Sequence, residues 1–167
     1  MTTTPDTMGP TSLAQRIEDF RLAYESRNVD AMMALFADDA DFIAAPGTFR
    51  GKQAVRLFLE WDARLSPTAR IRDVRSGVVV TGRSASWERV ISLTYQGIPY
   101  EERTMAVVEF DEHGLITSLR SYYDKLDVID QIASRSTGIR GWIDKKVTGY
   151  LVAAGRRGLD PAALGDR

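Results

Sequence analysis

The feature that most constrains the fold is a series of four segments, all after Pro67, in which apolar and polar residues alternate. These segments are residues 71–80, 85–95, 100–110 and 115–123, and a glycine-containing turn separates each from the next. Because successive side chains of a β-strand point to opposite faces, this period of two predicts consecutive antiparallel strands with one apolar face. That face has to be covered by other parts of the chain.

Helical patterns precede these strands. Ser12 and Gln15 have the spacing of a capping box, and a row of apolar residues with helical spacing follows, which predicts an amphipathic helix that begins near Ser12. Further helices are expected over residues 30–36 and, after Gly51, through Val55, Phe58, Trp61 and Leu65, with one strand between them at 41–45. Helices followed by antiparallel strands predict an α+β domain in which the helices wrap a curved sheet.

The C-terminal part predicts two more helices, at residues 128–133 and, after Gly138, at 139–154. The second is amphipathic, and its apolar face consists of Ile139, Trp142, Ile143, Val147, Tyr150, Leu151 and Ala154. We therefore divide the chain into a flexible arm at 1–10, a main domain at 11–134 and a helical extension at 135–167. The apolar face of the extension can cover the pocket mouth, cover the outer sheet face or pack on a second subunit.

Composition excludes several classes of function. The chain has no cysteine and one histidine, His113, so disulfides, thiolate sites and multi-histidine metal sites are excluded, and we expect neither metal nor cofactor. The net charge of -1 gives no overall field for nucleic acid or an anionic membrane. No signal peptide and no run of ~20 apolar residues is visible, so we expect a cytoplasmic protein without nucleic-acid or membrane partners.

The alternation predicts which side chains face inward. In segment 85–95 Arg89 is the one charge among the mainly apolar odd positions, and in segment 100–110 Glu102 is the one charge among the mainly apolar even positions. In segment 115–123 the odd positions face inward and end at Tyr123. Arg89, Glu102 and Tyr123 are therefore expected to converge on the same apolar, concave surface.

The turns predict how these strands pair. A two-residue turn at Gln96-Gly97 places Glu102 opposite Ile91, with Arg89 as its diagonal neighbour at roughly 7 to 8 Å. If the following turn closes with Phe110 opposite Leu115, the same reasoning places Glu102 opposite Tyr123. Thr104 then lies opposite Ser121.

Two interpretations of these groups remain open. A carboxyl group at the bottom of an apolar pocket has a raised pKa and can act as a general acid or base, with Arg89 as its electrostatic partner and Tyr123 as a hydrogen-bond donor to an oxyanion. Alternatively, Glu102 and Arg89 form a structural ion pair and nothing reacts. In either case the residues expected to line a substrate pocket are Phe42, Trp61, Trp87, Ile91, Leu93, Thr104 and Ser121.

Three motifs resemble a known family. They are the run from Asp30 to Phe42, the Phe49-Arg-Gly51 turn before a helix, and Val108-Glu-Phe-Asp-Glu-His-Gly-Leu-Ile116 leading to Arg120-Ser-Tyr-Tyr-Asp124. They are similar to the SnoaL-like branch of the nuclear transport factor 2-like superfamily, over roughly residues 12–133. The resemblance implies a cone-shaped, cystatin-like fold and a homodimer.

The family's catalytic positions are only partly occupied in this chain. The pattern of limonene-1,2-epoxide hydrolases places their arginine on Arg89 but their two aspartates on Ile91 and Ser121. The pattern of ketosteroid isomerases places their tyrosine on Phe20 and their oxyanion-hole acid on Ala106. The resemblance therefore implies the polyketide or polyether cyclase branch, in which a carboxylate in the cone moves protons.

Two functional hypotheses follow. The first is a cofactor-independent enzyme that cyclises, isomerises or ring-opens an apolar polyketide-, terpenoid- or steroid-like substrate through Glu102, Arg89 and Tyr123. The second is a non-catalytic domain that binds a small molecule or recruits a partner, in which the same three residues form a closed network.

Overall fold

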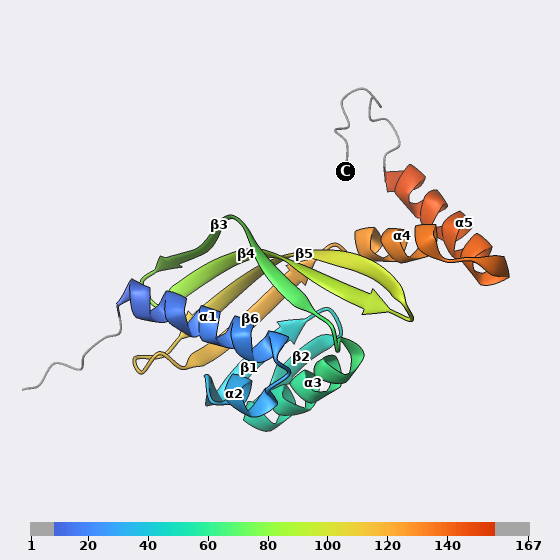
Figure 1. The fold of residues 1–167 in the computed structure, drawn as a ribbon. Helices are drawn as coiled ribbons and strands as arrows, with labels where there is room; N and C mark the ends of the chain where they lie inside the picture. Colours follow the sequence, from blue (N-terminus) through green and yellow to red (C-terminus); the bar gives the residue numbers. More distant parts are fainter. Residues whose placement is uncertain (1–8, 156–167) are drawn as a thin grey trace, which may run out of the picture. The chain divides into compact units, whose positions relative to one another are not determined.

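A computed structural model describes residues 9–155 of the chain, which divides into two compact units with the boundary between Asp124 and Lys125. The first unit contains a six-stranded sheet with the strand order β2-β1-β6-β5-β4-β3 (Figure 1). Its strands are β1 (Phe36–Ala44), β2 (Gly47–Arg50), β3 (Arg70–Thr81), β4 (Ser84–Tyr95), β5 (Ile98–Phe110) and β6 (Ile116–Tyr123).

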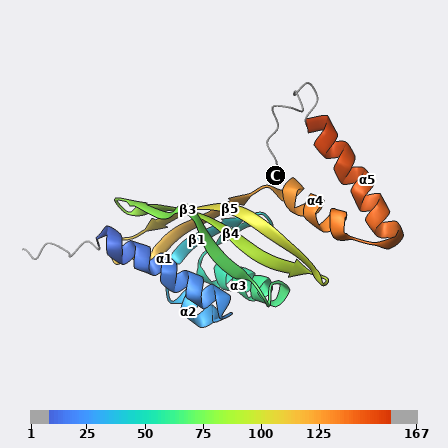
Figure 2. The same cartoon turned by 45° about the horizontal axis from the view of Figure 1, so that its top comes forward.

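Three helices cover one face of this sheet. They are α1 (Pro10–Glu25), α2 (Val29–Met33) and α3 (Lys52–Leu65), and they lie on the same side of the strands in both views (Figures 1 and 2). The core forms where they meet the sheet, because the apolar faces of helices and strands are buried against each other. Its largest fully buried side chains include Leu13, Ile17, Phe36, Leu59, Trp87, Val108 and Leu119. The predicted α+β class is therefore confirmed.

Strand β1 differs most from the sequence-based expectation. It begins at Phe36, five positions earlier than predicted, and Phe36 belongs to the strand and not to the preceding helix. It pairs with β2 in an antiparallel manner and with β6 in a parallel manner. The short strand β2 was not expected, because four residues are too few to show an alternating pattern.

Helix α1 also begins earlier than predicted. Gly9 is its N-cap and Pro10 is its first residue, so Ser12 lies inside the helix and caps nothing. The prediction of a capping box at Ser12 was wrong because proline, whose φ angle is already helical, is favoured at the first position of a helix. Gln15 instead donates to Asp19 across one turn, at 3.0 Å.

The second unit contains α4 (Lys125–Arg135) and α5 (Gly138–Gly155), so both predicted C-terminal helices are present. Four residues of the predicted apolar face, Trp142, Ile143, Val147 and Tyr150, are exposed. The boundary between the two units, after Asp124, lies ten residues before the predicted end of the main domain at residue 134. Residues 1–8 of the predicted arm, and residues 156–167 of the predicted extension, lie outside the described residues. Within the described part of the chain, no helix is both long enough and apolar enough to cross a membrane.

Candidate active site

A cavity of about 210 Å³ lies in the first unit, between the covered face of the sheet and helices α1 and α3. Aromatic and aliphatic side chains make up most of its wall, and Phe42 and Phe58 pack against each other there with ring centroids 4.8 Å apart. The titratable side chains that line it come from five elements and are Tyr24, Asp62, Arg89, Tyr95, Tyr100, Glu102 and Tyr123. A few polar groups in an apolar cavity are typical of a small-molecule site.

The pairing of β4 with β5 places Arg89 and Glu102 next to each other, as predicted. Tyr95 faces Ile98 across a two-residue turn, so Glu102 lies opposite Ile91. Arg89 lies opposite Thr104, two residues along β5 from Glu102. The cation and the carboxyl group are therefore diagonal neighbours on the inner face of the sheet.

The pairing of β5 with β6 differs from the prediction. Tyr123 lies opposite Thr104, and not opposite Glu102, while Ser121 lies opposite Ala106. The prediction was wrong for two reasons. The turn closes with Phe110 opposite Ile116 and not opposite Leu115, and a bulge between Glu109 and Phe110 shifts the ladder by one more residue. Tyr123 still lines the cavity, one diagonal step from Glu102.

Arg89 is the most deeply buried charged group of the site, with 5% of its surface exposed. Its guanidinium carbon lies 3.9 Å from the centroid of the Trp87 ring, which is fixed by a 2.7 Å hydrogen bond from its Nε1 to Asp73. The guanidinium Nε and Nη1 atoms are buried and find no hydrogen-bond partner among the residues that the structure describes. Burial lowers the pKa of Arg89 to about 10, and Tyr24, Glu102 and Asp73 offset that fall only in part.

Glu102 has a pKa in the range expected of a proton-transfer group. Burial and, to a smaller extent, the negative charge of Asp62 raise its pKa from 4.5 to about 7, although the charge of Arg89 opposes the rise. No ion pair within 4.0 Å joins Glu102 to Arg89, although both lie in the part of the chain that the structure describes. At neutral pH the carboxyl group is therefore divided between its acid and base forms.

A second carboxyl group, which the sequence analysis did not identify, faces the same cavity. Asp62 of α3 accepts a 2.7 Å hydrogen bond from the Tyr24 hydroxyl of α1. Burial raises the pKa of Asp62, and the bond from Tyr24 together with the charge of Arg27 opposes that rise. Burial, Asp62 and Glu102 raise the pKa of Tyr24, so its hydroxyl stays protonated and can donate.

Two further phenols, Tyr100 and Tyr123, line the cavity beside Glu102. Burial, reinforced by the charges of Glu102 and Asp62, raises the pKa of Tyr123. Burial and the charge of Glu102 raise the pKa of Tyr100 as well. Both hydroxyl groups are therefore neutral donors at physiological pH, which suits them to hold an oxyanion.

The structure brings most of the predicted site residues together. Besides Arg89, Glu102 and Tyr123, the cavity wall includes Phe42, Trp61, Ile91, Leu93 and Ser121. Trp87 and Thr104 do not belong to the wall: Trp87 is 1% exposed and lies against Arg89, and the Thr104 hydroxyl contacts the Arg89 and Glu102 carbonyl oxygens at 3.4 Å. These two residues therefore contact Arg89 and Glu102 from outside the cavity and help to hold them in place.

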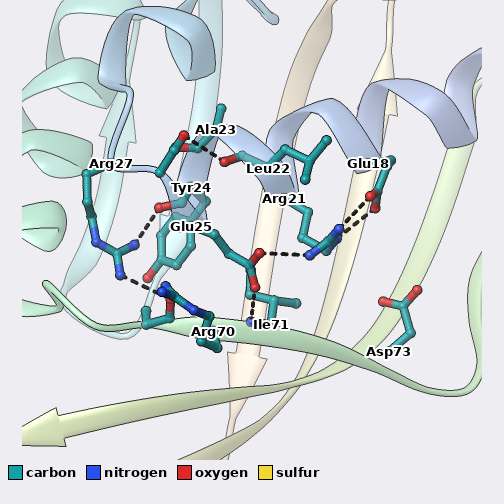
Figure 3. Close-up of polar contacts among 12 residues, drawn as sticks. Glu18, Arg21, Leu22, Ala23, Tyr24, Glu25, Arg27, Arg70, Ile71 and Asp73 are labelled. Atoms are coloured by element: carbon teal, nitrogen blue, oxygen red, sulfur yellow. Dashed lines mark hydrogen bonds and ion pairs between the residues drawn. The ribbon is translucent and has the colours of Figure 1, made fainter.

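Polar contacts hold the C-terminal end of α1 against β3 at the edge of the cavity (Figure 3). Glu25 accepts a 2.6 Å hydrogen bond from the Ile71 backbone N–H and a 2.8 Å bond from Arg21. Arg27 donates to the carbonyl oxygens of Tyr24 and of Ala69, the second at 3.2 Å. Both Tyr24 and Ile71 line the cavity, so these contacts fix the position of two wall residues.

The signals for Asp62 and Tyr24 were present in the sequence. Asp62 follows Phe58 by four positions and Leu59 by three, so helical spacing places it on the inner face of α3. Tyr24 follows Phe20 by four positions on α1, so the same spacing places it on the inner face of that helix. Among the described residues no group of three or more His, Asp or Glu side chains can hold a metal ion.

Solved structures of low sequence identity share this fold. A putative polyketide cyclase from Xanthomonas campestris pv. campestris aligns with a TM-score of 0.66 and 21% identity, over 73% of this chain and 97% of that one. An LEH-like epoxide hydrolase from M. tuberculosis aligns with a TM-score of 0.61 and 21% identity, over 82% of this chain and 96% of that one.

A third structure makes the fold assignment explicit. It is a hypothetical protein with a ketosteroid isomerase-like fold from Catenulispora acidiphila, in complex with trimethylamine, and it aligns with a TM-score of 0.64 and 18% identity over 74% of this chain and 98% of that one. No curated protein matches the sequence. The family model described as a SnoaL-like domain matches residues 17–119, which include α3 and most of the sheet. The chain therefore belongs to the SnoaL-like domain family, as its motifs predicted.

Proposed function

We propose that this protein is a cofactor-independent enzyme that cyclises, isomerises or ring-opens an apolar polyketide-, terpenoid- or steroid-like molecule in the cavity of its first unit. One observation carries the proposal: Glu102 lies in an apolar cavity with its pKa raised to about 7. A carboxyl group of that pKa exchanges protons with a substrate most effectively near neutral pH. The solved structures named polyketide cyclase and epoxide hydrolase support this class of chemistry.

In the proposed mechanism Glu102 takes a proton from a substrate atom, or donates one to it. Tyr123 donates a hydrogen bond to the oxygen on which negative charge develops, and Arg89 stabilises the ionised form of Glu102 electrostatically. Asp62 holds a negative charge near Glu102 and so keeps its pKa high. Tyr24 fixes the orientation of Asp62 through their hydrogen bond.

The size of the cavity limits which substrates can fit. Its volume of about 210 Å³ lies below the ~300 to 1,000 Å³ of sites that bind drug-sized ligands. This supports a substrate with one or two rings over a four-ring steroid. The aromatic wall around Phe58 and Trp61 favours a flat or unsaturated body.

The test compares Glu102→Gln with Glu101→Gln, a matched control whose side chain belongs to the opposite face of the same strand. Two probes are used: a β,γ-unsaturated cyclohexenone, whose conjugation is followed by ultraviolet absorbance, and cyclohexene oxide, whose hydrolysis is followed by gas chromatography. We expect wild type and E101Q to turn over at least one probe, and E102Q to lose about 10²-fold or more while it still binds the probe.

Two results contradict the proposal. One is a folded E102Q variant that keeps wild-type turnover. The other is an E102Q variant that loses folding stability but binds ligands unchanged, while wild type turns over neither probe; this outcome favours the non-catalytic binding domain.

A further inference from the structure

The guanidinium of Arg89 is a buried cation, and the part of the chain that the structure describes leaves two of its nitrogen atoms without a hydrogen bond. Among residues 9–155, its Nε and Nη1 atoms have no hydrogen-bond partner, and no ion pair within 4.0 Å joins it to Glu102. The contacts that do hold it use its π face and not its N–H groups, because the Trp87 ring lies 3.9 Å from the guanidinium carbon. A charged group that is 5% exposed is costly to bury unless it meets an opposite charge.

The residues around Arg89 indicate what kind of ligand can bring a negative charge to it. Arg89 lines the cavity together with Ile91 and Leu93 of its own strand and with Phe42 and Phe58 across from it. A ligand that reaches the guanidinium therefore has an apolar body in contact with this wall. Guanidinium groups bind carboxylates most strongly, because two parallel N–H donors match the two carboxylate oxygens.

We propose that the cavity binds a monocarboxylate with an apolar body of one or two rings, and that Arg89 receives the carboxylate. This inference deepens the proposed function, since it places the ligand in the same cavity and names its charged end. Under it, Arg89 anchors the ligand, while Glu102 and Tyr123 remain free to act on the apolar body. Trp87 and Asp73 act as positioning residues, because the Trp87 ring packs against the guanidinium and the hydrogen bond to Asp73 holds that ring in place.

The two acidic groups of the cavity make this binding depend on pH. An ionised Glu102 competes with the ligand carboxylate for Arg89, and the two negative charges repel each other in an apolar site. Glu102 therefore has to be protonated when the ligand binds, and with its pKa of about 7 the uptake of that proton falls in the neutral range. The charged and titratable groups that face Glu102 from the elements around it are Tyr24 of α1, Asp62 of α3, Arg89 of β4, Tyr100 of β5 and Tyr123 of β6.

The test measures binding by isothermal titration calorimetry with three probes that share one apolar body: cyclohexanecarboxylate, cyclohexylmethanol and cyclohexylmethylamine. We expect the carboxylate to bind the wild-type protein about tenfold or more tightly than the alcohol at about pH 6. Because the protonated fraction of Glu102 falls about tenfold between pH 6 and pH 8, the affinity for the carboxylate falls by about the same factor. Its binding enthalpy varies with the ionisation enthalpy of the buffer, since a proton is taken up.

Variants separate the roles of the two charged residues. Arg89→Met keeps an unbranched, flexible side chain of similar bulk near the backbone and removes the charged guanidinium, and we expect it to lose the preference for the carboxylate over the alcohol. Glu102→Gln is expected to bind the carboxylate equally well at both pH values. Arg103→Met is the matched control, because Arg103 is exposed on the opposite face of β5, and it is expected to leave both affinities unchanged.

The inference is overturned if the carboxylate binds no more tightly than the alcohol, if the amine binds best, or if a folded R89M variant keeps its affinity for the carboxylate. If R89M does not fold, the probe series and the buffer dependence of wild type decide the question alone. None of these readouts involves turnover. An inactive protein that binds the carboxylate would contradict the proposed function and not this inference, and an active protein that rejects it would do the reverse.

Discussion

Replacing Glu102 with glutamine should stabilise the protein at alkaline pH. The pKa of Glu102 rises from 4.5 to about 7 on folding, and one pKa unit corresponds to about 1.36 kcal/mol, so ionising Glu102 costs up to about 3 kcal/mol more in the folded protein than in the unfolded chain. Below pH 4.5 Glu102 is protonated in both the folded and the unfolded chain, so the folded protein does not bear this cost. The free energy of unfolding then falls as the pH rises toward and through about 7, because the folded pKa is raised. Solvent in the cavity reduces the figure, and we expect about 2 kcal/mol.

The assay is urea denaturation, followed by circular dichroism, at about pH 5 and about pH 8. The free energy of unfolding of wild type should fall between these values relative to that of E102Q, which has no group to ionise at this position. The Glu101→Gln variant should follow wild type, because it leaves Glu102 intact. An E102Q variant that is less stable than wild type at the higher pH would refute the reasoning, because a structural ion pair with Arg89 requires that result.

Two further predictions concern residues that support the site. Asp62→Asn removes the negative charge beside Glu102, so the pKa of Glu102 should fall below about 7, and a carbon NMR titration that finds it unchanged would contradict the coupling of the two acids. Gly77→Ala should lower the free energy of unfolding by about 1 kcal/mol more than Gly82→Ala, measured by urea denaturation. Both glycines have positive φ angles, of +61° and +59°, but only at Gly77 would a Cβ lie 3.0 Å from the Asp73 carboxylate, and equal losses would refute this account.

The inner face of the sheet could be predicted from the sequence because strand geometry has a strict period. On β4 and β5 every second residue points to the same side, so Arg89 and Glu102 were identified as the charged groups of an apolar face. The register of these two strands could also be predicted, because a two-residue turn at Gln96-Gly97 allows only one register. The register of β6 could not be predicted in the same way. The turn pairs Phe110 with Ile116 and the bulge adds one more residue, and these two single shifts together leave the alternation unchanged.

The helical side of the site was harder to predict. An aspartate on a helix is most often solvated, and only the structure shows that α3 turns Asp62 toward the cavity and within 2.7 Å of the Tyr24 hydroxyl. The bond joins two residues separated by 38 positions in the chain. Such a contact depends on how α1 and α3 pack against the sheet, which local spacing does not determine.

The parallel pairing of β1 with β6 has a consequence for how the protein is made. Phe36 of β1 pairs with Ile116 of β6, so β1 cannot complete its pairing until β6, which is synthesised much later, has left the ribosome. Contacts between such distant parts of a chain are slow to form, because a long loop has to close before they are gained. The edge of β1 stays unpaired in the nascent chain until then, and any product that terminates before β6 carries that edge into solution as a template for aggregation.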